Sequence, residues 1–138
     1  MPDQSEQFQA RVEELVAQFE DEIDRSEWTT RRYPKRFRDA DCGIREIPAL
    51  FLQKGTVRLL LDPIGYDIPG AEGLADIYLM PAYDPQASIY FEEGRWRIHY
   101  AFPADPVETR SKFETRSLPV EGASINQILD SIAEHAIP

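Results

Sequence analysis

Four polar side chains on two neighbouring segments could together form a binding surface: Tyr90, Glu92, Arg97 and His99. Tyrosine and arginine dominate the binding energy of many protein interfaces, so a rigid pair of strands that carries both suits the binding of another protein. The alternative is an ordinary hydrated sheet face on which Tyr90 and Arg97 form a cation–π pair. We expect this group on the outer face of a β-hairpin.

A second candidate is a strongly basic segment in an otherwise acidic chain. It contains five cationic residues, Arg31, Arg32, Lys35, Arg36 and Arg38, interleaved with Tyr33 and Phe37. Arginine and aromatic side chains suit a phosphate or a nucleic acid. Alternatively, the segment pairs with an acidic helix and is anchored by its two aromatic residues. No glycine-rich phosphate loop accompanies it, so the phosphate hypothesis has no specific motif behind it.

Carboxylates suggest two further kinds of chemistry. Residues 62–76, DPIGYDIPGAEGLAD, predict a long irregular loop with four acidic side chains. Such a loop could border a pocket for a small ligand or a substrate, or hold a hard cation. Its spacing does not match a calcium-binding EF-hand, and we predict no metal site. Asp84 and Asp105 could pair for acid–base chemistry, but each precedes a proline and is better explained as a turn residue.

The chain lacks the motifs of common enzyme classes. It has no G-x-S-x-G, no phosphate-binding P-loop and no H-E-x-x-H. With His99 and His135 as its two histidines, a histidine-rich metal site is excluded. We therefore expect no cofactor and no catalytic residues, and favour a non-catalytic protein.

The clearest structural element is a β-hairpin over residues 87–102, ASIYFEEGRWRIHYAF. A two-residue loop, Glu93-Gly94, suits a type I′ turn because glycine tolerates a positive φ. This loop sets Phe91 opposite Trp96 and Tyr90 opposite Arg97. The apolar side chains then share one face, and the polar group described first shares the other.

The remaining elements surround this hairpin. Helical periodicity predicts helices over 5–24 and 124–136. A second hairpin is predicted over 47–61 with a Lys54-Gly55 turn, although a short helix from Ile44 to Phe51 competes with it. Single strands are predicted over 77–83 and 112–118. The chain thus predicts one α+β domain, residues 1–138: a twisted antiparallel sheet of five or six strands with both helices on one face.

Composition limits the classes of binding partner and the cellular location that we expect. The net charge of −10 repels nucleic acids and anionic membranes. A single cysteine, Cys42, excludes an intramolecular disulfide. Neither a signal peptide nor an apolar run of about 20 residues is present, which favours the cytoplasm.

Three functional hypotheses follow. The first is a small acidic binding or adaptor protein that contacts another protein through the exposed sheet face. The second is a small-ligand binder or an enzyme with a site bordered by 62–76. The third is nucleic-acid or phosphate contact through residues 31–38, which the net charge disfavours. We also consider a homodimer, through an edge strand or the exposed face.

Overall fold

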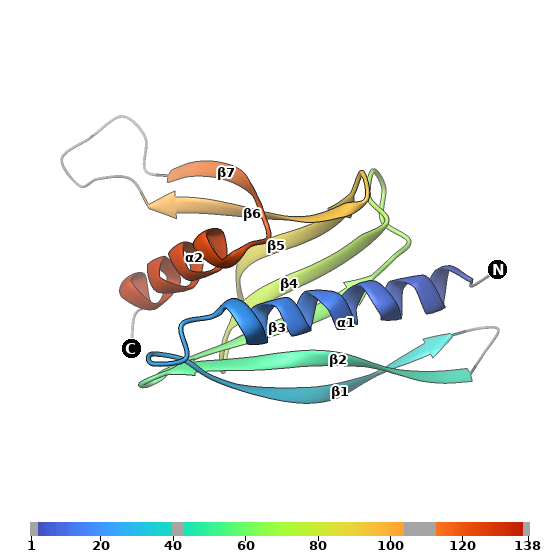
Figure 1. Cartoon of the computed structure of the whole chain (residues 1–138), viewed down its shortest axis with the longest axis horizontal. Coiled ribbons are helices and arrows are strands. Elements are labelled where there is room, and N and C mark those ends of the chain that lie inside the picture. Colours follow the sequence, from blue (N-terminus) through green and yellow to red (C-terminus); the bar gives the residue numbers. More distant parts are fainter. Residues whose placement is uncertain (1–2, 40–42, 104–112, 137–138) are drawn as a thin grey trace.

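A computed structural model of the protein describes residues 3–39, 43–103 and 113–136. Two helices and seven strands make an α+β fold (Figure 1). In chain order they are α1 (Gln4–Glu22), β1 (Thr29–Asp39), β2 (Gly43–Lys54), β3 (Val57–Gly65), β4 (Gly73–Leu79), β5 (Asp84–Glu92), β6 (Arg95–Pro103), β7 (Phe113–Pro119) and α2 (Gly122–His135). Neither helix among the described residues is long and apolar enough to span a membrane.

The strands form one sheet in the order β1-β2-β3-β4-β5-β6-β7, and every neighbouring pair is antiparallel. The α+β class is therefore confirmed, but the prediction of five or six strands is wrong. The strand without a sequence prediction is β1, which contains the basic segment. Pro34 forbids a regular helix through Tyr33, but it is compatible with β1, since β1 is an edge strand, where a missing N–H is tolerated.

The hairpin of β5 and β6 has the predicted register. Phe91 pairs with Trp96, Tyr90 with Arg97, and the Glu93-Gly94 loop has φ of 54° and 79°. Positive φ at both loop positions is the signature of a type I′ turn. The prediction of strand 112–118 is also confirmed, by β7.

The register predicted for the second hairpin is wrong by two residues. Lys54 lies in β2 and pairs with Val57, so the turn is Gly55-Thr56. Leu52 therefore pairs with Leu59. A shift of two residues keeps every side chain on its face, because the period of a strand is two.

The prediction of an irregular loop over 62–76 is also wrong at both ends. Its first residues complete β3 and its last residues, from Gly73, begin β4. Gly73 is buried, and a Cβ there would lie 3.2 Å from the Trp96 ring and 3.4 Å from Phe8. This glycine allows close packing within a strand instead of loop flexibility.

Both helices pack into one hydrophobic core on one face of the sheet (Figure 1). Asp3 caps α1 by accepting a hydrogen bond from the Glu6 N–H at 2.7 Å. Trp96 Nε1 on β6 donates to the Arg11 carbonyl of α1 at 3.0 Å. The Tyr100 hydroxyl hydrogen-bonds the Ser131 hydroxyl of α2 at 2.8 Å. The Trp96 and Tyr100 bonds join α1 and α2, respectively, to strand β6.

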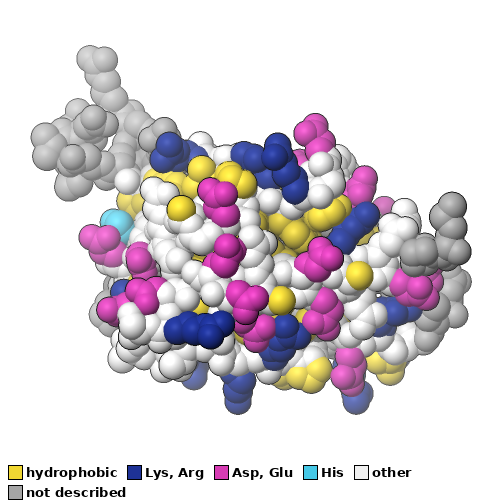
Figure 2. Space-filling model, in the orientation of Figure 1, with side chains coloured by type: hydrophobic (Ala, Val, Ile, Leu, Met, Phe, Trp, Pro, Cys, Tyr) yellow, Lys and Arg dark blue, Asp and Glu magenta, His cyan; other side chains and the backbone are white. Residues whose placement is uncertain are grey.

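The charges on the helix-bearing side are mixed. Figure 2 shows Asp and Glu side chains interspersed with Lys and Arg over this side, with basic side chains projecting from the lower edge, where β1 lies. Carboxylates on α1 account for part of this pattern. The helices leave the opposite face of the sheet uncovered, and the cross-strand pairs identify the side chains on it.

Candidate arginine–aromatic binding surface

One row of side chains crosses four strands on the face opposite the helices. Arg31 on β1 pairs with Phe51 on β2, Phe51 pairs with Leu60 on β3, and Leu60 pairs with Tyr78 on β4. Residues directly opposite each other share a face, and the neighbours of Phe51 in sequence are turned to the other. Leu52 belongs to the helix-covered core, so the row faces away from the helices.

Aromatic rings and arginines continue this row into a patch. The Tyr33 ring lies 6.0 Å from the Phe51 ring, and the Arg31 guanidinium lies 5.4 Å from the same ring. The Tyr83 ring, from the turn after β4, lies 5.9 Å from Tyr78. We call this patch the arginine–aromatic surface: Arg31, Tyr33, Phe51, Arg58, Tyr78, Met80 and Tyr83. Tyr33 and Tyr83 are 51% and 58% exposed, respectively.

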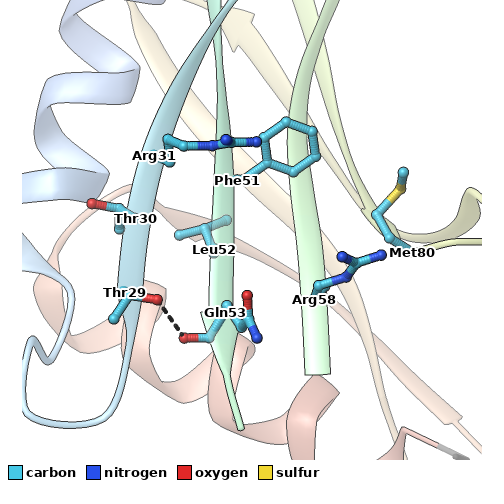
Figure 3. Close-up of a pocket in the computed structure, with 8 residues that line it drawn as sticks. All are labelled: Thr29, Thr30, Arg31, Phe51, Leu52, Gln53, Arg58 and Met80. Carbon is cyan, nitrogen blue, oxygen red and sulfur yellow. Dashed lines mark hydrogen bonds between the residues drawn. The ribbon is translucent and has the colours of Figure 1, made fainter. Parts of the chain in front are cut away.

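A pocket of about 590 Å³ opens on this surface (Figure 3). Its lining consists of Thr29, Thr30, Arg31, Phe51, Leu52, Gln53, Arg58 and Met80. In Figure 3 the Arg31 side chain extends across β2 to the Phe51 ring, and the Arg58 side chain extends towards Met80. Two cationic groups and no carboxylate therefore line the pocket.

The structure divides the predicted basic segment among several roles. Arg32 points to α1, where it contacts Glu20 at 2.7 Å and Glu13 at 2.9 Å. These bonds raise the pKa of the Arg32 guanidinium, and the hydrogen bond to Glu20 has the largest effect. Lys35 contacts the Asp62 carboxylate at 2.9 Å and donates to a β3 carbonyl. Arg32 and Lys35 therefore stabilise the fold.

The other three cations of the segment remain available. Arg31 contacts the Phe51 ring and lines the pocket. Arg36 and Arg38 are exposed, and neither has an ion pair or a hydrogen bond with its side chain within the described part of the chain. The segment is thus split between fold stabilisation and surface charge.

The structure brings together the four polar residues of the predicted sheet-face site. The Tyr90 and His99 rings lie 4.8 Å apart, and His99 Nε2 lies 3.6 Å from a Glu92 carboxylate oxygen. Arg97 donates to the hydroxyl and the carbonyl of Ser117 on β7, both at 2.9 Å. All four are half-buried. Arg97 is therefore held by β7, and His99 lies close to Glu92 and Tyr90.

The carboxylates of 62–76 are separated instead of gathered. Asp62 and Asp76 are cross-strand partners in the sheet, whereas Asp67 and Glu72 line a pocket of about 390 Å³ beside α1. The 62–76 segment thus borders a pocket, and Arg11 lies 3.3 Å from Glu72 in it. No group of three or more His, Cys, Asp or Glu within the described ranges could hold a metal ion. Cys42 and Asp105 lie outside those ranges.

Tyr78 links the arginine–aromatic surface, to which it belongs, to the carboxylate of Asp76, the cross-strand partner of Asp62. Its hydroxyl donates to Asp76 Oδ2 at 3.1 Å, and Ser88 donates to Asp76 Oδ1 at 2.9 Å. Burial, then the Asp76 charge and this hydrogen bond, and then the Asp62 charge raise the pKa of Tyr78 from 10.0 to about 12. The neutral phenol is therefore the form that the folded protein favours.

Ultraviolet titration of phenolate should resolve one of the six tyrosines. We expect one phenol to ionise near pH 12, and Tyr78→Phe to remove that step. The Tyr78 phenol contributes its full stabilisation below pH 10, and this contribution is lost as the pH rises from 10 towards 12. If Tyr78→Phe leaves the highest ionisation in place, burial of Tyr78 beside Asp76 does not raise its pKa as described.

Sequence reasoning missed Phe51, Arg58, Tyr78, Met80 and Tyr83 as site residues. The alternation of the second hairpin could have placed Phe51 and Arg58 on the uncovered face, since a two-residue error in register leaves every side chain on its face. No sequence signal marks Tyr83, which reaches the surface from a turn.

No family model, curated protein or solved structure matches this chain.

Proposed function

We propose that this protein is a small, non-catalytic binding or adaptor protein that contacts another protein through the helix-free face of its sheet. The observation that carries the proposal is the arginine–aromatic surface: Tyr33 and Tyr83 keep half or more of their area exposed, and the same patch contains Arg31 and Arg58. Tyrosine and arginine are enriched among the residues that dominate interface energies. Phe51 beside Tyr33 supplies apolar area, and the pocket supplies a concave shape.

The backbone at Tyr83 supports a role in binding. Tyr83 has a φ of 54°, a left-handed conformation that costs a bulky residue on the order of 1–3 kcal/mol. Its ring is mostly exposed and contacts Tyr78 at the edge of the surface. The burial of this ring therefore contributes little to the fold in return, whereas a partner protein would gain a rigid aromatic contact.

Replacing Tyr83 by asparagine tests the proposal, and Glu93→Asn is its matched control. Both residues have a φ of 54°, and they lie at opposite ends of β5. Asparagine tolerates this conformation, so we expect both variants to keep or gain up to about 1 kcal/mol in the free energy of unfolding. Only Tyr83→Asn should weaken partner binding, by about tenfold or more.

The measurements are chemical denaturation and calorimetric titration. The partner is first captured from lysate of the native cell, identified and purified, so that its affinity for each variant is measured directly. Loss of affinity in Tyr83→Asn with retained stability supports the proposal. Equal affinities of the wild-type protein and both variants would place the binding surface elsewhere.

The Tyr90 group extends the same proposal along the sheet. Tyr90, Glu92, Arg97 and His99 share the uncovered face with the arginine–aromatic surface, and a large partner would cover both. We rank this group second because Arg97 and His99 already contact Ser117 and Glu92. Forming an interface there would require these bonds to be buried or exchanged.

The remaining hypotheses of the sequence analysis stay predictions. The pocket beside α1 keeps the small-ligand alternative open, with Arg11, Asp67 and Glu72 in its lining. Nucleic-acid binding would use Arg31, Arg36 and Arg38, against a net charge of −10. Homodimerisation by pairing of β1 edges is disfavoured by Pro34, since proline has no N–H to donate across an edge.

A further inference from the structure

We infer that the pocket of the arginine–aromatic surface takes an acidic segment of the partner protein, with a carboxylate between Arg31 and Arg58 and an apolar side chain against Phe51 and Met80. This inference rests on the proposed function and deepens it by naming the chemistry of the partner. It starts from the two guanidinium groups that Figure 3 shows on one pocket.

The charges around the pocket are unusual for this chain. The protein has 25 acidic and 15 basic residues, yet the eight pocket residues include two arginines and no acid. Neither arginine has an ion pair with any residue in the described ranges, and the Arg31 guanidinium lies over the Phe51 ring. Guanidinium groups bind carboxylates and phosphates through paired N–H donors, so two arginines without ion pairs on one pocket suit an anion.

The strand arrangement holds the two arginines on either side of an apolar centre. Arg31 is on the edge strand β1, opposite Phe51 on β2. Arg58 is on β3, opposite Gln53 on β2. The Met80 N–H donates to the Arg58 carbonyl at 2.9 Å, which ties the turn after β4 to this part of β3. A segment that crosses the strands can therefore place a carboxylate and an apolar side chain in the same pocket.

The overall charge favours a protein carboxylate over a nucleic acid. A polynucleotide brings one charge per phosphate towards a chain of net charge −10, so its long-range repulsion is large. A single aspartate or glutamate, or a C-terminal carboxylate, brings one charge directly to the two arginines. The adjacent Phe51 and Met80 side chains suit the aromatic or aliphatic neighbour of that carboxylate.

Selection from a displayed library of random peptides tests this inference on the full-length protein. Enriched peptides are synthesised, and their affinities for the wild-type protein, an R31Q/R58Q variant and an R36Q/R38Q control are measured by calorimetry. The control removes the same charge at exposed β1 arginines outside the pocket. We expect the enriched peptides to share an acidic residue or a free C-terminus beside an apolar residue.

The affinity of these peptides should fall by about tenfold or more in R31Q/R58Q and by less than about threefold in R36Q/R38Q. Enriched peptides without a carboxylate that bind R31Q/R58Q unchanged but lose affinity for Tyr83→Asn would overturn the inference and leave the proposed function standing. Peptides insensitive to all of these substitutions, or no enrichment, would contradict both. Tight, salt-sensitive binding of a single-stranded oligonucleotide, lost in R31Q/R58Q, would also overturn the carboxylate inference.

Discussion

Replacing Phe19 by alanine is expected to lower the free energy of unfolding by about 3–5 kcal/mol. Phe19 is fully buried in α1, within the core that joins both helices to the sheet. Its removal leaves a cavity that close-packed neighbours cannot fill, in addition to the lost transfer free energy. Since domains of this size are stable by about 5–15 kcal/mol, a large part of the total stability depends on this one ring.

Urea denaturation measures this loss, and Tyr33→Ala is its control. Tyr33 is 51% exposed on the opposite face of the sheet, with one aromatic contact to Phe51. Its substitution should cost no more than about 1 kcal/mol. Similar losses for both variants would mean that the face opposite the helices belongs to the core, which contradicts its description as uncovered.

Reversing both pocket charges, in an R31E/R58E variant, is expected to lower the affinity for the partner protein by about a hundredfold or more. Two attractive contacts with an acidic segment become two repulsive ones, and a buried charge pair that loses one member costs about 2–5 kcal/mol. The fold should be unaffected, because neither arginine forms an ion pair within the described residues. Circular dichroism and denaturation check that assumption.

The control for this prediction is R36E/R38E, which has the same change in net charge. Arg36 and Arg38 are exposed on β1 but do not line the pocket. We expect this control to reduce the association rate and to leave the dissociation rate nearly unchanged, because distant charges act mainly on encounter. Equal effects of both variants on the dissociation rate would rule out specific recognition by Arg31 and Arg58.

The sequence predicted the hairpin of β5 and β6 most accurately, because its two-residue loop determines the register of the two strands. Gly94 suits the positive φ of a two-residue turn, and one apolar and one polar face follow from that register. The second hairpin shows the limit of this reasoning. Gly55 is the first residue of its turn and not the second, and adjacent leucines allow either register. The faces were still correct.

Strand β1 was not predicted because its sequence is typical of an edge strand. Its side chains are mostly charged and exposed, and Pro34 removes a backbone donor, so neither alternation nor propensity indicates a strand. Its place in the sheet comes from pairing with β2, which is information about a distant segment. The same pairing turns Arg32 to α1 and Arg31 to the pocket, a division that a count of basic residues cannot reveal.

The candidate surface was only partly accessible to sequence reasoning for a similar reason. Its residues come from four strands and a turn, and Tyr83 reaches it through a left-handed backbone that tyrosine rarely adopts. The predicted Tyr90 group was easier to recognise, since two neighbouring strands supply it. In the structure, however, that group has fewer unsatisfied polar atoms to offer a partner.

The most direct test of the binding face is a chemical-shift footprint of the purified partner on the isotope-labelled protein. The protein is small enough for backbone assignment, and the amides of α1 and α2 report on the helix-bearing side. We predict that the largest amide shift changes fall at Arg31, Phe51, Arg58 and Tyr83. Changes confined to α1 and α2, with these four amides unmoved, would contradict the central claim that the helix-free face binds the partner.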